Sequence, residues 1–164
     1  MNQTTPAWKR KLKRAGLVLG SSFAVIGLFF YFATKEIPKT PEELKPLLEN
    51  QANRFLRCLE AKQIGSCYYD LTSENFRRAT ELQVIAGLSE SIRDKLGRRI
   101  SGAMDDSTFT PFDVDSHGIT TKAKFNMIAI YQNDATVNET FGFAFDPKTA
   151  DYKVEIFKIK SSRF

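Results

Sequence analysis

The sequence has few residues of the kinds that bind metals or act as nucleophiles. It contains two Cys and one His in 164 residues. A chain so poor in cysteine is not a disulfide scaffold, and its Cys and His show no metal-ligand spacing. The length allows one modest domain and excludes a large multidomain enzyme. With 42% hydrophobic and 26% charged residues, the chain can form a packed core and is not disordered throughout.

The excess of positive charge is confined to the N-terminus. The net charge is +5, and no Asp or Glu precedes Ala15. Five basic residues precede it: Lys9, Arg10, Lys11, Lys13 and Arg14. The other 19 basic residues are balanced by 19 acidic residues. A nucleic-acid-binding domain needs a basic face that neutralises phosphates, so we expect no nucleic acid partner.

A long apolar segment follows this basic tail. Nineteen consecutive residues, from Ala15 to Ala33, carry neither a charge nor an amide side chain. As a helix they would cover about 28 Å, close to the hydrocarbon thickness of a bilayer. A cleaved signal peptide has a shorter apolar region and small residues before the cut, whereas a cut after Ala33 would place Tyr31 at the −3 position. The pattern therefore favours a retained transmembrane helix over 15–34, after a tail over 1–14.

The basic tail also predicts how this span is oriented. Lys and Arg gather on its N-terminal side, whereas Lys35 and Lys39 on the other side are diluted by Glu36 and prolines. The positive-inside rule places the tail in the cytoplasm and everything after the span outside it, in the periplasm of a bacterial inner membrane. Small residues recur at four-residue spacing in the span, which permits close helix packing but is also common in lipid-facing helices. They are Gly16, Gly20 and Ala24.

A linker over 35–40 leads into a folded domain over 41–164 whose first half is helical. Thr40, Pro41 and Glu43 combine an N-cap, a proline at the first helical position and a capping-box glutamate. Apolar residues at helical spacing then predict a helix to about residue 62. A short helix over 67–71 follows, and the capping pattern at Thr80 opens a third helix that ends near Ile100 and Gly102.

The second half alternates apolar and polar residues with the period of β-strands. Strands are predicted over 108–115, 119–131, 135–145 and 152–160, separated by turn residues. Three helices followed by four antiparallel strands indicate an α+β domain. We expect the helices to pack on one face of a curved sheet.

Three segments together resemble a known superfamily. They are FLRCLEAKQIGSCYYDLTSENFR at 55–77, TELQ at 80–83 and NETFGFAFDPKTADYKVEIFKI at 138–159. They are similar to the cone-shaped nuclear transport factor 2-like superfamily, and in particular to its small bacterial envelope members. The resemblance covers roughly 41–164. It implies a cone-shaped fold that serves enzymes, small-ligand binders and assembly modules alike, so that the fold alone does not identify the function.

The resemblance implies that catalytic members carry an Asp, often with His or Tyr, on the inner wall of the cone. Pocket candidates here are Tyr68, Tyr69, Asp70, Phe125, Phe141 and Phe143. Asp70 is placed either as an acid beside Tyr69 or as a cap of the next turn. The phenylalanines either line a pocket or fill the core. His117 lies in a turn. With Asp113 and Asp115 it would supply three metal ligands without a fourth, so we predict no metal site. We also predict no cofactor and no catalytic residue.

The two cysteines bracket the turn between the first and second predicted helices. Cys58 and Cys67 can form a disulfide in an oxidising compartment if their Cα atoms lie about 4.4 to 6.8 Å apart. The alternative is a pair of buried small apolar residues, which is also common. No His lies near either thiol in the sequence, so we assign no nucleophile.

These patterns favour a non-catalytic binding or scaffold module on a single membrane anchor. Its expected partners are the lipid bilayer, other envelope proteins and further copies of itself. By resemblance, the bitopic inner-membrane scaffold of type IV secretion systems is a precedent. The alternative is a small-molecule binder or an isomerase or dehydratase of the same fold. A third possibility is a membrane-surface effector whose basic tail is attracted to anionic lipid by about 1 kcal/mol per charge.

Overall fold

The computed structural model describes residues 40–116 and 118–163. The predicted tail and membrane span, including Ala15, Gly16, Gly20, Ala24 and Ala33, lie outside these residues, as does His117. Within the described part of the chain, no helix combines the length and the apolar character needed to cross a bilayer.

The first described helix, α2 (Pro41–Glu60), begins where the capping pattern predicts. The Thr40 hydroxyl accepts a hydrogen bond from the Glu43 backbone N–H at 3.3 Å, and the Glu43 carboxylate accepts one from the Thr40 N–H at 3.2 Å. This reciprocal pair satisfies two backbone donors that the helix itself leaves unpaired. The buried stripe of α2 comprises Leu44, Leu48, Ala52, Phe55, Leu56 and Leu59. Helix α2 therefore has a continuous apolar face to pack on the sheet.

Three further helices follow within the described residues, one more than predicted. They are α3 (Ile64–Leu71), α4 (Glu74–Ala79) and α5 (Leu82–Leu96). Helix α4 was missed because six residues are too few to show a helical period, although Ser73 caps it by accepting from the Phe76 N–H at 3.1 Å. The predicted cap at Thr80 is wrong. Thr80 is the C-cap of α4, and Glu81 precedes α5 without a capping side-chain bond.

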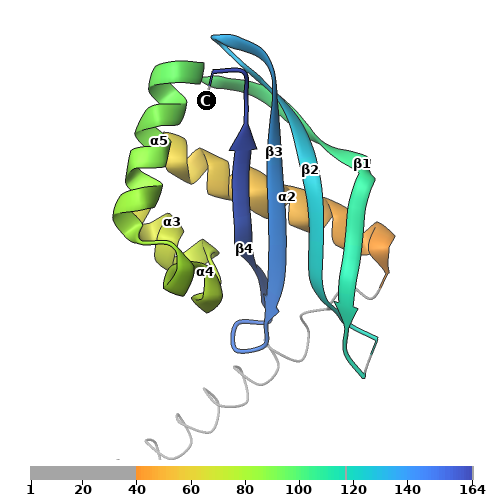
Figure 1. Ribbon diagram of the computed structural model, residues 1–164. Coiled ribbons are helices and arrows are strands. Elements are labelled where there is room, and N and C mark those ends of the chain that lie inside the picture. Colours follow the sequence, from red (N-terminus) through yellow and green to blue (C-terminus); the bar gives the residue numbers. More distant parts are fainter. Residues whose placement is uncertain (1–39, 117, 164) are drawn as a thin grey trace, which may run out of the picture. The chain divides into compact units, whose positions relative to one another are not determined.

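Four antiparallel strands form a single open sheet (Figure 1). They are β1 (Arg99–Val114), β2 (Thr120–Tyr131), β3 (Asp134–Asp146) and β4 (Asp151–Lys160), in the spatial order β1-β2-β3-β4. Each strand pairs with the next one along the chain. The domain is therefore α+β, as predicted.

Strand β1 begins earlier than the alternation of residues suggests. Helix α5 ends at Leu96, where Gly97 adopts a φ of 77° that favours glycine, and the strand starts two residues later. The predicted helix end near residue 100 and strand start at 108 are both wrong. The reason is an irregularity in the pairing: residues 106–109 lie between the pairs Asp105–Asn126 and Thr110–Lys124. This bulged stretch disrupts the period of two on which the prediction depends.

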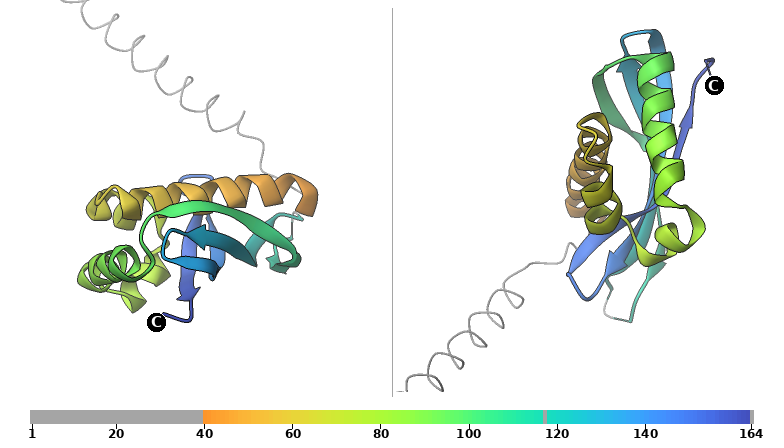
Figure 2. Two further views of the ribbon diagram at one scale, coloured as in Figure 1. Left: turned by 90° about the horizontal axis from the view of Figure 1, so that it is seen from above. Right: turned by 90° about the vertical axis from the view of Figure 1, so that its left-hand side faces the viewer.

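Helices cover only one face of the sheet (Figures 1 and 2). Helix α2 crosses that face, and α5 runs beside the sheet on the β4 side. The opposite face carries no described helix. Phe125 and Met127 of β2 have no exposed surface, whereas Ile128 and Ile130 are 48% and 45% exposed. The core therefore lies between the helices and one face of the sheet.

Candidate functional site

Three of the predicted pocket residues fill the core. Phe125, Phe141 and Phe143 have no exposed surface, and their rings stack with centroids 5.7 to 6.0 Å apart. Phe55 of α2 meets Phe141 edge to face at 6.3 Å. These rings occupy the centre of the space between helix and sheet. Their burial and packing stabilise the domain and leave their surfaces inaccessible to a ligand.

The other three predicted pocket residues lie on α3, but not together. Tyr68 is buried, and its hydroxyl donates to the carbonyl oxygens of Arg77 at 3.0 Å and Thr80 at 2.6 Å. Tyr69 is 64% exposed, and Asp70 is exposed beside it. The structure therefore separates a buried aromatic core from an exposed pair of polar residues, and the six predicted residues do not form one site.

Tyr69 and Asp70 line a wide polar groove. The groove has a volume of about 710 Å³ and lies between α3, α4 and the β3–β4 hairpin. Lys153 of β4 donates to the Asp70 carbonyl oxygen at 2.6 Å, and the Asn75 amide donates to Glu155 at 2.9 Å. Its charged lining is mixed: Arg54, Arg77, Lys148, Lys153, Asp70, Glu74, Asp146, Asp151 and Glu155. Because positive and negative side chains are intermixed around the groove, it favours neither an anionic nor a cationic substrate.

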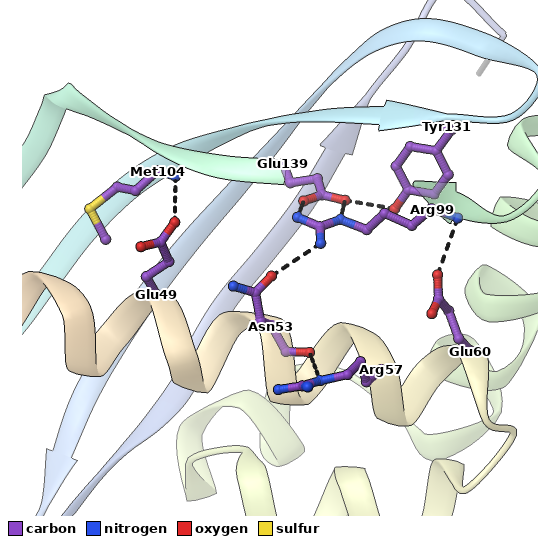
Figure 3. A network of polar contacts seen from close by, with 8 residues as sticks. All are labelled: Glu49, Asn53, Arg57, Glu60, Arg99, Met104, Tyr131 and Glu139. Atoms are coloured by element: carbon purple, nitrogen blue, oxygen red, sulfur yellow. Dashed lines mark hydrogen bonds and ion pairs between the residues drawn. The ribbon is translucent and has the colours of Figure 1, made fainter. Parts of the chain in front are cut away.

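A buried polar network was not predicted from the sequence (Figure 3). Arg99 on β1 and Glu139 on β3 form an ion pair, with Arg99 Nε 3.2 Å from Glu139 Oε1 and Nη2 3.1 Å from Oε2. The Tyr131 hydroxyl on β2 donates to Glu139 Oε1 at 2.6 Å. Glu139 has no exposed surface. The network thus joins three neighbouring strands through one buried carboxylate.

Helix α2 contributes the remaining partners of this network. The Asn53 side-chain oxygen accepts from Arg99 Nη1 at 3.1 Å, and Glu60 accepts from the Arg99 backbone N–H at 3.2 Å. One turn earlier, Glu49 accepts from the Met104 N–H of β1 at 3.0 Å. These bonds attach α2 to the irregular strand β1, which gives the network a clear structural role.

Burial is the main influence on the pKa values of Glu139 and Tyr131 in this network. It raises the pKa of Glu139, while the hydrogen bond from Tyr131 and the charge of Arg99 act in the opposite direction. Burial, with Glu139 next to it, also raises the pKa of Tyr131 above its usual value. Both acidic groups are held by partners within the protein. The Tyr131 hydroxyl donates to Glu139, and both Glu139 oxygens accept from Arg99, so the arrangement fixes these side chains in place.

A smaller and more apolar pocket adjoins this network. Its volume is about 310 Å³, and its walls come from α2, α5 and the end of β2. The lining residues are Leu56, Leu59, Glu60, Ser89, Ile92, Arg93, Gly97, Arg98 and Tyr131. None of the six pocket residues predicted from sequence belongs to it. Its residues are widely spaced along the chain, and only the packing of α5 on α2 brings them together.

The uncovered side of the sheet presents a third distinctive surface. Residues paired across strands point to the same face, so Lys158 lies on the side of Asn126, and Lys160 on the side of Ile128. We call this surface the open face and define it by Lys124, Ile128, Ile130, Lys158 and Lys160, all of which are exposed. It combines apolar side chains with positive charges on β2 and β4, and Asp105 of β1, which pairs with Asn126, adds one carboxylate on the same side.

Cys58 and Cys67 are joined in a disulfide between α2 and α3, with their Cα atoms 5.8 Å apart. Among the described residues, no three His, Cys, Asp or Glu side chains are grouped so that they could hold a metal ion.

The chain was compared with protein-family models and with curated proteins, and neither comparison finds a match.

Proposed function

We propose that this protein is a non-catalytic docking module of the cell envelope. Its domain over 41–164 is a nuclear transport factor 2-like cone held at the membrane by a single span over 15–34. The single observation that carries the docking role is the open face, where Ile128 and Ile130 remain about half exposed on a sheet whose other face is covered by helices. Exposed apolar side chains gathered on one surface are typical of protein interaction sites.

The charges of the open face favour a particular kind of partner. Lys124, Lys158 and Lys160 accompany the two isoleucines on the same face of the sheet. Two copies of this surface would bring like charges together, which costs energy. A different envelope protein, with acidic residues around an apolar centre, complements both features. We therefore assign a heterologous partner to this surface.

The filled core supports docking over catalysis. Phe125, Phe141 and Phe143 occupy the space where a substrate cavity would lie, and they pack on α2 without exposed surface. Asp70, the acid that the sequence offers for catalysis, lies in a groove of mixed charge. A general acid or base near neutral pH needs a distinctive environment and a defined approach for its substrate.

A cross-linking experiment on the full chain tests the docking role. A water-soluble carbodiimide, which joins a lysine amine to a carboxylate as an amide and leaves as its urea, is applied to intact cells, and the extracted protein and its partners are mapped by mass spectrometry. We expect cross-links from Lys124, Lys158 or Lys160 to acidic segments of another protein. Ile130→Glu should reduce them at least fivefold. Val84→Glu alters an apolar residue that is 59% exposed on α5 and is the matched control. Equal cross-linking in both variants, or cross-links between copies, would contradict the proposal.

The membrane anchor is tested separately. We expect the full chain to stay in the membrane fraction after washes with high salt and with alkaline carbonate, because a span of nineteen apolar residues does not depend on surface charge. Release by salt alone, or a mature N-terminus beyond residue 34, would contradict a transmembrane anchor.

A further inference from the structure

The pocket between α2 and α5 has walls suited to an apolar group. Leu56 and Leu59 of α2 and Ile92 of α5 line it, and all three are nearly buried. Two hydroxyl groups also line it, but both are engaged within the protein. Ser89 donates to the Leu59 carbonyl oxygen at 2.9 Å, and Tyr131 donates to Glu139 at 2.6 Å. The interior therefore favours a hydrocarbon over a polar group.

The rim of the same pocket is positively charged. Arg93 lies in the last turn of α5, and Arg98 follows the turn at Gly97. Both side chains are exposed, and neither guanidinium group has a hydrogen-bond or ion-pair partner among the described residues. The single rim carboxylate, Glu60, accepts a hydrogen bond from the backbone N–H of Arg99. Two cations with available donors thus adjoin an apolar pocket.

We propose that this pocket binds a short-chain anionic amphiphile, with its hydrocarbon between Leu56, Leu59 and Ile92 and its carboxylate at Arg93 and Arg98. Guanidinium groups present donors in a geometry that matches a carboxylate. The volume of about 310 Å³ is at the lower end of the range of about 300 to 1,000 Å³ for ligand pockets, so it suits a short acyl chain. The site is on the helix side of the sheet and is independent of the open face.

Isothermal titration with octanoate tests the site directly. The full chain is reconstituted in phospholipid nanodiscs, and empty nanodiscs provide the reference for partition into lipid. We expect saturable binding of octanoate, at least tenfold weaker binding of octanol and of octyltrimethylammonium, and no binding of acetate. Affinity should rise about fourfold per methylene from butanoate to octanoate, the increment expected for burial of one CH₂ group. Octanol binding as tightly as octanoate, or heat no larger than with empty nanodiscs, would overturn the proposal.

Two double variants distinguish a specific role of the rim arginines from a general effect of removing positive charge. Arg93→Gln/Arg98→Gln changes exposed side chains. We expect it to weaken octanoate binding at least tenfold and to leave octanol binding unchanged. Lys62→Gln/Lys148→Gln removes the same charge from exposed residues outside the pocket and should bind octanoate as the unmodified chain does. Equal loss in both variants would refute a carboxylate site at the rim. Thermal unfolding of each variant verifies that it is folded.

Discussion

Arg99 and Glu139 form a two-point ion pair across the intervening strand β2, with Nε 3.2 Å from Oε1 and Nη2 3.1 Å from Oε2. The Glu139 side chain has no exposed surface, and that of Arg99 is 12% exposed. Removal of either partner leaves the other charge buried without compensation. Such a loss costs more than the pair itself contributes, because desolvation offsets much of the attraction between the two charges.

We therefore expect Glu139→Gln to lower the free energy of unfolding by about 3 kcal/mol, measured by urea denaturation at pH 7. The matched control is Glu74→Gln. Glu74 lies 2.5 Å from Arg78, but both side chains are largely exposed, and an exposed pair contributes less than about 1 kcal/mol. Equal effects of the two substitutions would show that burial of the Glu139 pair has no energetic consequence.

Replacing both members of the buried pair by apolar side chains should be milder than removing one. We expect Arg99→Met/Glu139→Leu to recover at least half of the stability lost in Glu139→Gln, since no unpaired charge remains. The Tyr131 hydroxyl loses its acceptor in this variant, which limits the recovery. A double variant that is less stable than Glu139→Gln would show that the pair is itself strongly stabilising.

Glycine at position 102 leaves room for the Arg99 side chain. A Cβ atom at Gly102 would overlap the Arg99 guanidinium group and approach the Ala129 side chain to 3.2 Å. We expect Gly102→Ala to displace Arg99 from Glu139 and to destabilise the domain by about 2 kcal/mol. Thermal and urea unfolding measure the change.

Gly87 provides the opposite case and serves as the control. It lies inside α5, and a Cβ atom there meets nothing within 4 Å. Gly87→Ala should stabilise the domain by about 0.5 to 1 kcal/mol, because alanine favours the helix and restricts the unfolded chain. Destabilisation by both alanines would contradict the specific role assigned to the Gly102 position.

The disulfide between Cys58 and Cys67 closes a short loop at the α2–α3 turn. We expect Cys58→Ala/Cys67→Ala to lower the free energy of unfolding by about 2 to 3 kcal/mol, the effect of opening a loop of about ten residues. Alanine avoids placing a hydroxyl at the buried Cys67 position. Dithiothreitol should lower the melting temperature of the unmodified chain and leave that of the variant unchanged. An unmodified chain that is insensitive to complete reduction would contradict this role.

The sequence predicts the elements best where one local pattern is sufficient. The capping box at Thr40 and Glu43 marks the start of α2, and alternation along β2 correctly places Phe125 and Met127 toward the core. Prediction fails where tertiary pairing overrides the pattern. Residues 106–109 interrupt the register of β1, so the alternation of apolar and polar residues along this strand can be recognised only after residue 109.

The polar network and the apolar pocket depend on contacts that no local pattern shows. Glu139 is the one charged residue among inward positions of β3 such as Val137 and Phe141, and this anomaly was the available signal. Its partner Arg99 lay in a segment predicted as helix. The pocket rim, at Arg93 and Arg98, forms only because α5 ends at Leu96 and the chain turns into β1.

The Tyr152 hydroxyl gives the domain a defined alkaline transition. It donates to the Thr120 carbonyl oxygen at 2.6 Å, and the side chain is 2% exposed. Burial, assisted by the nearby Asp115, raises the pKa of Tyr152 to about 12 from its usual value of 10.0. The folded state therefore keeps a proton that the unfolded state releases above pH 10. The free energy of unfolding therefore falls by about 2 kcal/mol as the pH rises from 10 toward 12.

Tyr152→Phe isolates this effect. At pH 8 the variant should be about 1 kcal/mol less stable, because it lacks the hydrogen bond to Thr120. It has no proton to lose, so its stability should fall less steeply with pH, and the two urea-unfolding curves should cross near pH 11. Tyr69→Phe removes an exposed hydroxyl and should follow the unmodified chain. If Tyr152→Phe and the unmodified chain lose stability in parallel between pH 10 and 12, the alkaline transition has another origin, and Tyr152 contributes only its hydrogen bond.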